Sequence, residues 1–79
     1  MKINKEKLIN EYIDGLKIGT ETTVLHKERG TEYVVEMVVK DATNNNDGGY
    51  IVIYREVMTV TKRWAREIDE FCDGRFIII

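Results

Sequence analysis

Apolar residues near the start of the chain recur every three to four positions, as on one face of a helix. This stripe comprises Leu8, Ile9, Tyr12, Ile13 and Leu16. Asn4 precedes the stripe and is a favourable N-cap residue, and Gly15 is favourable just beyond a helix end. The pattern therefore predicts a helix over residues 4–14.

From residue 22 onward the pattern changes to short segments rich in β-branched and aromatic residues, which are typical of strands. Strands are predicted at residues 22–27, 31–40, 50–55, 62–67 and 76–79. Within the second of these, Tyr33, Val35, Met37 and Val39 would share one face by simple alternation, and Val34 and Val38 would share the other with Glu36 and Lys40.

The connections between these strands carry their own signals. Gly30 lies in the first turn, where a positive φ is useful, and residues 41–49 form a polar, glycine-rich loop. Residues 68–72 are predicted to form one helical turn that buries Ile68 and Phe71, and Asp73 and Gly74 make a turn before the last strand. Residues 56–61 fit either a longer strand or a wide turn.

This order of elements predicts an α+β, mostly β fold: a small SH3-like, partly open antiparallel barrel with an added N-terminal helix. The chain would be a single domain over residues 1–79, with the sheet over residues 22–79. The apolar last strand is expected to be paired, because an exposed edge of this composition invites aggregation.

Composition narrows the range of functions. A chain of 79 residues needs most of its apolar side chains for its core, so a site is expected in a surface groove or at an interface. A homodimer that buries more area is an alternative. The net charge of −2 argues against broad nucleic-acid binding but allows a local basic patch. One cysteine and the absence of a long apolar stretch fit a soluble cytoplasmic protein that does not bind membranes.

Three short motifs occur in a fixed order. His26, Gly30, Tyr33 and Val35 resemble a hairpin motif H-x-x-G-x-x-Y-x-V, with one more residue between His26 and Gly30. Val52, Tyr54 and Arg55 match V-x-Y-R, and Trp64, Arg66 and Phe71 match a following W-x-R and F. Together, over residues 22–76, they resemble a family of small bacterial and phage domains of unknown function. The resemblance implies a small barrel and a bacterial or phage source, and it implies no activity.

Histidine and cysteine, which can act as a general base and a nucleophile, each occur once. His26 is expected to bond a backbone group of its hairpin, since a catalytic role would need a nucleophile or carboxylate within reach. Cys72 is expected to be inert, because its acidic neighbours disfavour the thiolate. One histidine and one cysteine do not make a zinc site. No catalytic residue, metal or cofactor is predicted.

Basic and aromatic residues interleave on two predicted neighbouring strands. The set comprises Tyr54, Arg55, Lys62, Arg63, Trp64 and Arg66. Guanidinium groups and aromatic faces suit phosphate contact and base stacking. Alternatively, Trp64 belongs to the core and its neighbours form an ordinary solvated face, since alternation separates Arg63 from Trp64 and Arg66.

An acidic set lies on the first hairpin: Glu28, Glu32, Glu36 and Asp41. It is expected to be a solvated face, or else a surface that mimics nucleic acid or docks on a basic protein. The leading interpretation is a non-catalytic binding module of phage or prophage type that binds and modulates another protein, such as a host factor or defence component. The alternative is a binder of nucleotide or single-stranded nucleic acid through the basic and aromatic set.

Overall fold

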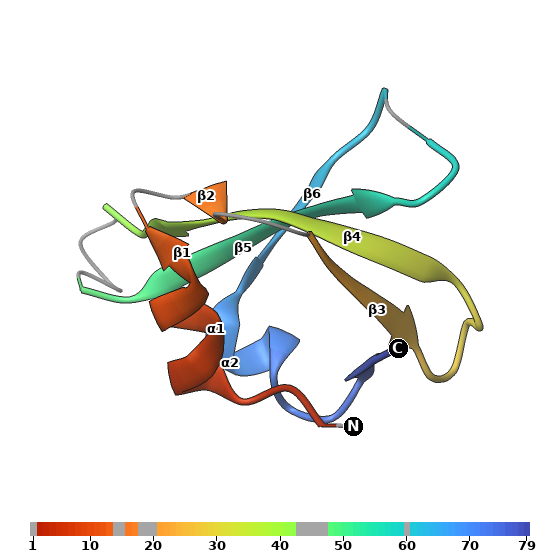
Figure 1. Ribbon diagram of the computed structural model, residues 1–79, viewed down its shortest axis with the longest axis horizontal. Coiled ribbons are helices and arrows are strands. Elements are labelled where there is room, and N and C mark those ends of the chain that lie inside the picture. Colours follow the sequence, from red (N-terminus) through yellow and green to blue (C-terminus); the bar gives the residue numbers. More distant parts are fainter. Residues whose placement is uncertain (1, 14–15, 18–20, 43–47, 60) are drawn as a thin grey trace.

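The computed structural model describes residues 2–13, 16–17, 21–42, 48–59 and 61–79. These residues form a small, mostly β fold with one antiparallel sheet and two short helices (Figure 1). The elements are α1 (Lys5–Glu11), β1 (Tyr12–Ile13), β2 (Leu16–Lys17), β3 (Thr22–His26), β4 (Glu32–Lys40), β5 (Tyr50–Glu56), β6 (Trp64–Glu67), α2 (Ile68–Phe71) and β7 (Phe76–Ile78).

The long strand β4 organises the sheet. It pairs with β5 along one edge, and with β3 and then β2 along the other. β6 extends the sheet beyond β5, and β7 extends it beyond β3, which gives the order β6-β5-β4-β3-β7. Among the described residues no ladder joins β6 to β7, so the curled sheet is not closed into a barrel.

The first helix begins where the sequence indicates. The Asn4 side chain accepts a hydrogen bond from the Lys7 N–H at 3.0 Å, which satisfies one free donor of the first turn. The helix ends at Glu11, however, and the expected continuation through residue 13 is wrong. Tyr12 and Ile13 instead form β1, and the Tyr12 hydroxyl donates a hydrogen bond to the Val35 carbonyl at 3.0 Å. Expectations for residues 14 and 15 lie outside the described part of the chain.

The N-cap provides a direct test of this local structure. Asn4→Ala is expected to lower the free energy of unfolding by about 1 kcal/mol, because the Lys7 N–H loses its partner. Urea denaturation followed by circular dichroism measures the change. Asn10→Ala is the matched control, since Asn10 is exposed inside the same helix and alanine favours helices. Equal losses in the two variants would contradict the capping role.

Strand β4 does not alternate as simply as its sequence suggests. Val35 lies opposite Tyr54 and Met37 lies opposite Ile53, so Glu36 is an extra residue that forms a β-bulge. The bulge reverses the facing of the second half of the strand. Val38, rather than Met37, therefore joins the core beside Val35, and the expected common face of Met37 and Val39 with Val35 is wrong.

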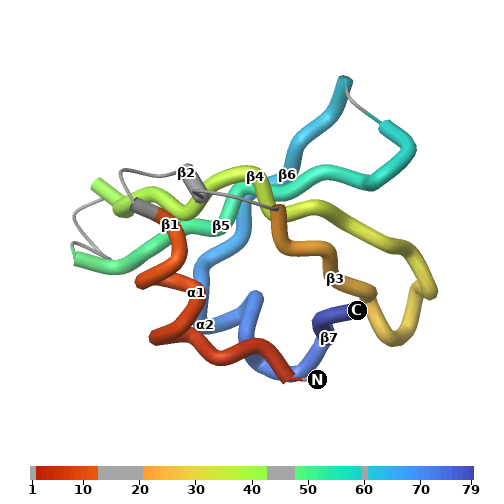
Figure 2. The backbone as a smooth tube through the Cα atoms, in the orientation of Figure 1, coloured from red at the N-terminus to blue at the C-terminus, as the bar shows by residue number. Residues whose placement is uncertain are grey.

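The end of the chain contributes three side chains to the core: Ile68, Phe71 and Phe76. Ile68 and Phe71 of α2 are fully buried, as predicted, and the Phe71 and Phe76 rings stack with centroids 4.5 Å apart. β7 is paired, as predicted, and its partner is β3; Ile77 makes a further bridge to Lys2. This bridge brings the first and last described segments together, as the chain trace shows (Figure 2).

The turns rely on glycine where φ is positive. Gly30 has φ of 69° and Gly74 has φ of 111°, in the two turns where the sequence predicts them.

After β5, residues 57 and 58 form a turn and Lys62 and Arg63 precede β6, so the predicted start of that strand at residue 62 is two residues early. In the described part of the chain, no helix has both the length and the apolar character needed to cross a membrane.

Candidate functional site

The structure separates the predicted basic and aromatic set into two groups. Trp64 lies directly opposite Tyr54 in the β5–β6 ladder, and Arg66 lies opposite Val52, so these side chains share one face of the sheet. Arg55 and Arg63 both contact Glu36 and therefore belong to a different site. Lys62 is exposed ahead of β6.

Three rings form a surface that we call the aromatic platform: Tyr33, Tyr54 and Trp64. The Trp64 ring stacks on Tyr54, with centroids 6.3 Å apart and an interplanar angle of 28°, and meets Tyr33 edge-on at 6.0 Å. Tyr33 and Tyr54 are buried, whereas Trp64 is 38% exposed. Trp64 is therefore not an ordinary core residue, because it rests on a buried base and keeps part of its surface open.

Arg66 borders the aromatic platform. Its Nε donates a hydrogen bond to the Tyr54 hydroxyl at 3.3 Å, and its guanidinium carbon lies 5.7 Å from the centre of the Phe76 ring. Both partners are uncharged, so they orient the guanidinium without neutralising it.

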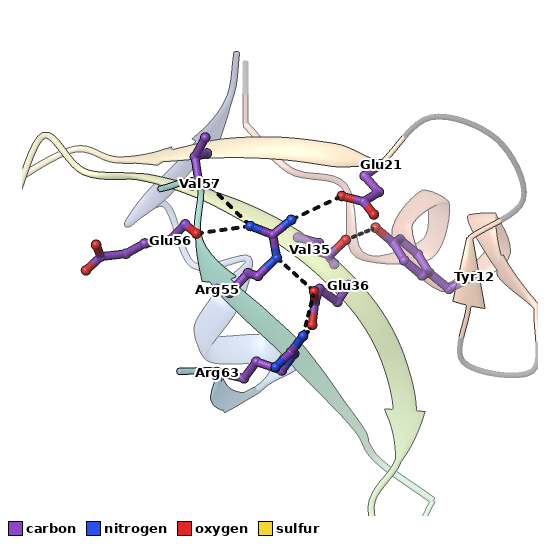
Figure 3. Close-up of polar contacts among 8 residues, drawn as sticks. All are labelled: Tyr12, Glu21, Val35, Glu36, Arg55, Glu56, Val57 and Arg63. Atoms are coloured by element: carbon purple, nitrogen blue, oxygen red, sulfur yellow. Dashed lines mark hydrogen bonds and ion pairs between the residues drawn. The ribbon is translucent and has the colours of Figure 1, made fainter. Parts of the chain in front are cut away.

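The second group, the Glu36 cluster, comprises Glu36, Arg55 and Arg63 (Figure 3). Arg55 Nε donates to Glu36 at 2.8 Å, and another Arg55 nitrogen donates to the carbonyls of Glu56 and Val57 at 3.2 and 3.3 Å. The Glu36 and Arg55 side chains are only 18% and 17% exposed. Hydrogen bonds from Arg63 and then Arg55 lower the pKa of the Glu36 carboxyl. These two arginines are thus engaged in holding the bulge and the end of β5.

The other acidic residues and the cysteine show no arrangement for catalysis among the described residues. Glu28 and Glu32 are exposed, whereas Glu36 is an ion-pair partner and not part of a solvated acidic face. Burial, and next the carboxylate of Asp69, raise the pKa of the Cys72 thiol, which favours the unreactive protonated form. Among the described residues no three histidine, cysteine or carboxylate side chains are placed to hold a metal ion.

His26 bonds its own hairpin, as the sequence predicts. Its Nδ1 accepts a hydrogen bond from the Arg29 N–H at 3.2 Å, and its ring meets Phe76 edge-on at 5.0 Å. The residue is buried except for a small part of its surface. His26 therefore supports the turn between β3 and β4.

A polar pocket beside His26 was not foreseen from the sequence. We call it the cationic pocket, and its lining residues are His26, Lys27, Glu28, Arg29, Arg66, Asp73, Gly74 and Arg75. The Lys27 N–H donates to the Arg75 carbonyl at 2.9 Å, so the pairing of β3 with β7 brings the two turns together. The one available signal was that His26, Gly30 and Arg66 belong to the three short motifs described above.

Comparison with known proteins does not assign the chain to a family. No protein-family model, curated protein or solved structure matches the chain. The resemblance of residues 22–76 to small bacterial and phage domains stays a prediction. The aromatic platform and the cationic pocket are therefore the two features of the described residues that bear on function.

Proposed function

We propose that this chain is a small non-catalytic binding module of phage or prophage type, which binds and modulates another protein in the bacterial cytoplasm. The partner would be a protein such as a host factor or a defence component. The observation that carries the proposal is Trp64, a large aromatic side chain that is 38% exposed on a buried aromatic base. Tryptophan and arginine are the residues that most often dominate the energy of protein interfaces.

The aromatic platform suits such a contact for an energetic reason. Because Trp64 is already stacked on Tyr54 and held edge-on by Tyr33, little side-chain freedom is left to lose on binding. Arg66 on the same face adds a charged group beside the apolar surface. An apolar centre with a polar margin is the usual composition of a protein interface.

The strand order supports the further proposal that the fold is an SH3-like, partly open barrel with an added N-terminal helix. Four consecutive strands, β3 to β6, form a meander, and the last strand returns to pair with the first of them. The single turn of α2 precedes that last strand, and the barrel would open between β6 and β7.

The test compares partner recovery by the wild-type protein and by Trp64→Ala, each immobilised and exposed to lysate of the bacterial host. A specific partner is expected on the wild-type protein and at least about tenfold less of it on Trp64→Ala, the loss that a residue worth about 1.4 kcal/mol causes. Quantitative mass spectrometry measures the recovery.

Met58→Ala is the matched control, because Met58 is also a large apolar side chain and is 92% exposed, outside the aromatic platform. Its recovery should equal that of the wild type. An NMR spectrum of each variant verifies folding. Absence of a specific partner on the wild-type protein would contradict the proposed function, and equal recovery on Trp64→Ala would contradict the role of the platform.

The second candidate is a binder of nucleotide or single-stranded nucleic acid, favoured by the open face of Trp64 next to Arg66. A base could stack on the indole while the guanidinium meets a phosphate. Arg55 and Arg63 do not support this candidate, since both are held by Glu36. The oligonucleotide titration described in the next subsection tests it.

A further inference from the structure

The cationic pocket lies on the side where the sheet stays open. Two turns supply most of its wall, residues 27–29 after β3 and residues 73–75 before β7, and Arg66 reaches it from β6. The pocket is open to solvent and has a volume of about 660 Å³. Arg66 also contacts Tyr54 of the aromatic platform, so this one side chain links the pocket to the platform.

The pocket concentrates positive charge on a protein whose net charge is −2. Four cationic side chains line it: Lys27, Arg29, Arg66 and Arg75. Two carboxylates, Glu28 and Asp73, oppose them. The net charge of the pocket lining is therefore positive, whereas the net charge of the whole chain is negative.

Most of this positive charge has no ion-pair partner in the part of the chain that the structure describes. Asp73 is committed to its own turn, because its carboxylate accepts from the Arg75 N–H at 3.1 Å and pairs with Arg75 Nε at 3.0 Å. Within the described residues neither Lys27 nor Arg29 has an ion-pair partner, and Arg66 is held only by an uncharged hydroxyl and a ring. Three cations thus face a single unpaired carboxylate, that of Glu28.

We propose that the cationic pocket binds a carboxylate side chain from an acidic segment of the partner protein, while an adjacent apolar residue of that segment rests on Trp64. The assignment follows from charge complementarity, and it rests on the proposed protein-binding function. It names the chemistry that the partner must present: an acidic residue beside an apolar one in an accessible segment.

The observations favour a protein carboxylate over a nucleic-acid strand. The positive excess of the pocket is small and local, which suits one or two negative charges. A phosphodiester chain carries one negative charge on every nucleotide, so it would need a run of cations that extends past the pocket. The residues that follow Arg66 do not supply one, because Glu67 and Glu70 are exposed carboxylates and Asp69 is paired with Lys5 at 2.7 Å.

Titration of the ¹⁵N-labelled protein with three probes tests the proposal by NMR. The probes are a short peptide of alternating glutamate and leucine, the same peptide with glutamine for glutamate, and a single-stranded oligothymidylate. The glutamate peptide is expected to shift the amides of residues 27–30 and 73–75 and the indole N–H of Trp64. The glutamine peptide is expected to bind at least about tenfold more weakly, and salt should weaken the glutamate peptide alone.

Two variants identify the cations involved. Arg29→Gln and Arg66→Gln should each weaken the glutamate peptide by about tenfold, the usual effect of losing a charged hydrogen-bond donor. Arg29→Gln keeps the backbone N–H that donates to His26, so this variant should fold normally. It therefore still tests the pocket if Arg66→Gln does not fold. Lys62→Gln is the matched control, since Lys62 is an exposed cation outside the pocket, and it should bind like the wild type.

Equal binding of the two peptides, or unchanged binding by both arginine variants, would overturn the proposal. Tighter binding of the oligonucleotide at the same amides would also overturn it, in favour of the nucleic-acid candidate. The lysate experiment distinguishes a failure of the carboxylate pocket from a failure of the protein-binding function. A partner that is lost on Trp64→Ala but retained on Arg29→Gln and Arg66→Gln would refute the carboxylate pocket and leave the protein-binding function standing.

Discussion

Phe71→Ala is expected to lower the free energy of unfolding by about 3–5 kcal/mol, the usual cost of deleting a buried phenylalanine. Phe71 is 0% exposed, its ring stacks on Phe76 at 4.5 Å, and it meets Tyr54 at 5.2 Å. Small domains are commonly stable by only about 5–15 kcal/mol, so this loss would remove much of the total. Urea denaturation followed by circular dichroism measures it.

Cys72→Ala is the control for Phe71→Ala, because Cys72 is the next residue and is only half-buried. Its effect should be clearly smaller. Phe71→Leu should fall between wild type and Phe71→Ala, and it provides a measurable value if the alanine variant does not fold. A midpoint for Phe71→Ala equal to that of the wild type would show that α2 does not anchor the core.

Glu36→Gln is expected to destabilise the protein by about 1–3 kcal/mol at neutral pH, the typical worth of hydrogen bonds to a charged group. The substitution removes the charge that Arg55 and Arg63 both contact. Because those contacts lower the pKa of Glu36 in the folded state, its stabilising contribution is complete above the unfolded-state value near 4.5. It is lost as the pH falls through the folded-state pKa.

The difference between wild type and Glu36→Gln should therefore shrink as the pH falls from 7 to about 3. Urea denaturation at a series of pH values measures this difference. Glu32→Gln is the matched control, since Glu32 is an exposed residue of the same strand with no ion pair among the described residues. A difference that stays constant with pH, or an equal effect of Glu32→Gln, would refute the role of Glu36.

The features that sequence reasoning predicted well are those decided by a few neighbouring residues. The Asn4 cap, the burial of Ile68 and Phe71 on one helical turn, the positive φ of Gly30 and the turn at Gly74 all follow from local geometry. Each needs only side chains within about four positions of each other.

The features that were missed depend on partners far away in the chain. The helix ends at Glu11 because β1 pairs with β2 and Tyr12 reaches the carbonyl of Val35. The bulge at Glu36 exists only in relation to β5, and periodicity within one strand cannot reveal it.

In the candidate site, too, the local contacts were predicted from the sequence and the non-local ones were not. The bond of His26 to its own turn is local and was predicted. The cationic pocket was not, because the β3–β7 ladder brings Lys27 and Arg29 to Arg75 from opposite ends of the sheet-forming segment. For Trp64 the sequence left a surface role and a core role open, and the structure places it between them, 38% exposed on the edge strand β6 of the described sheet.

The bulge at Glu36 has a consequence for how this chain can vary in evolution. The residue that lengthens β4 by one position is also the carboxylate that Arg55 and Arg63 share. A relative with a straight strand would lack this position, and both arginines would lose their contact with it, which leaves Arg55 the longer contact to Glu21 at 3.9 Å. In an alignment of relatives, a one-residue gap here should therefore coincide with the replacement of both arginines, so that strand length and charge are inherited together.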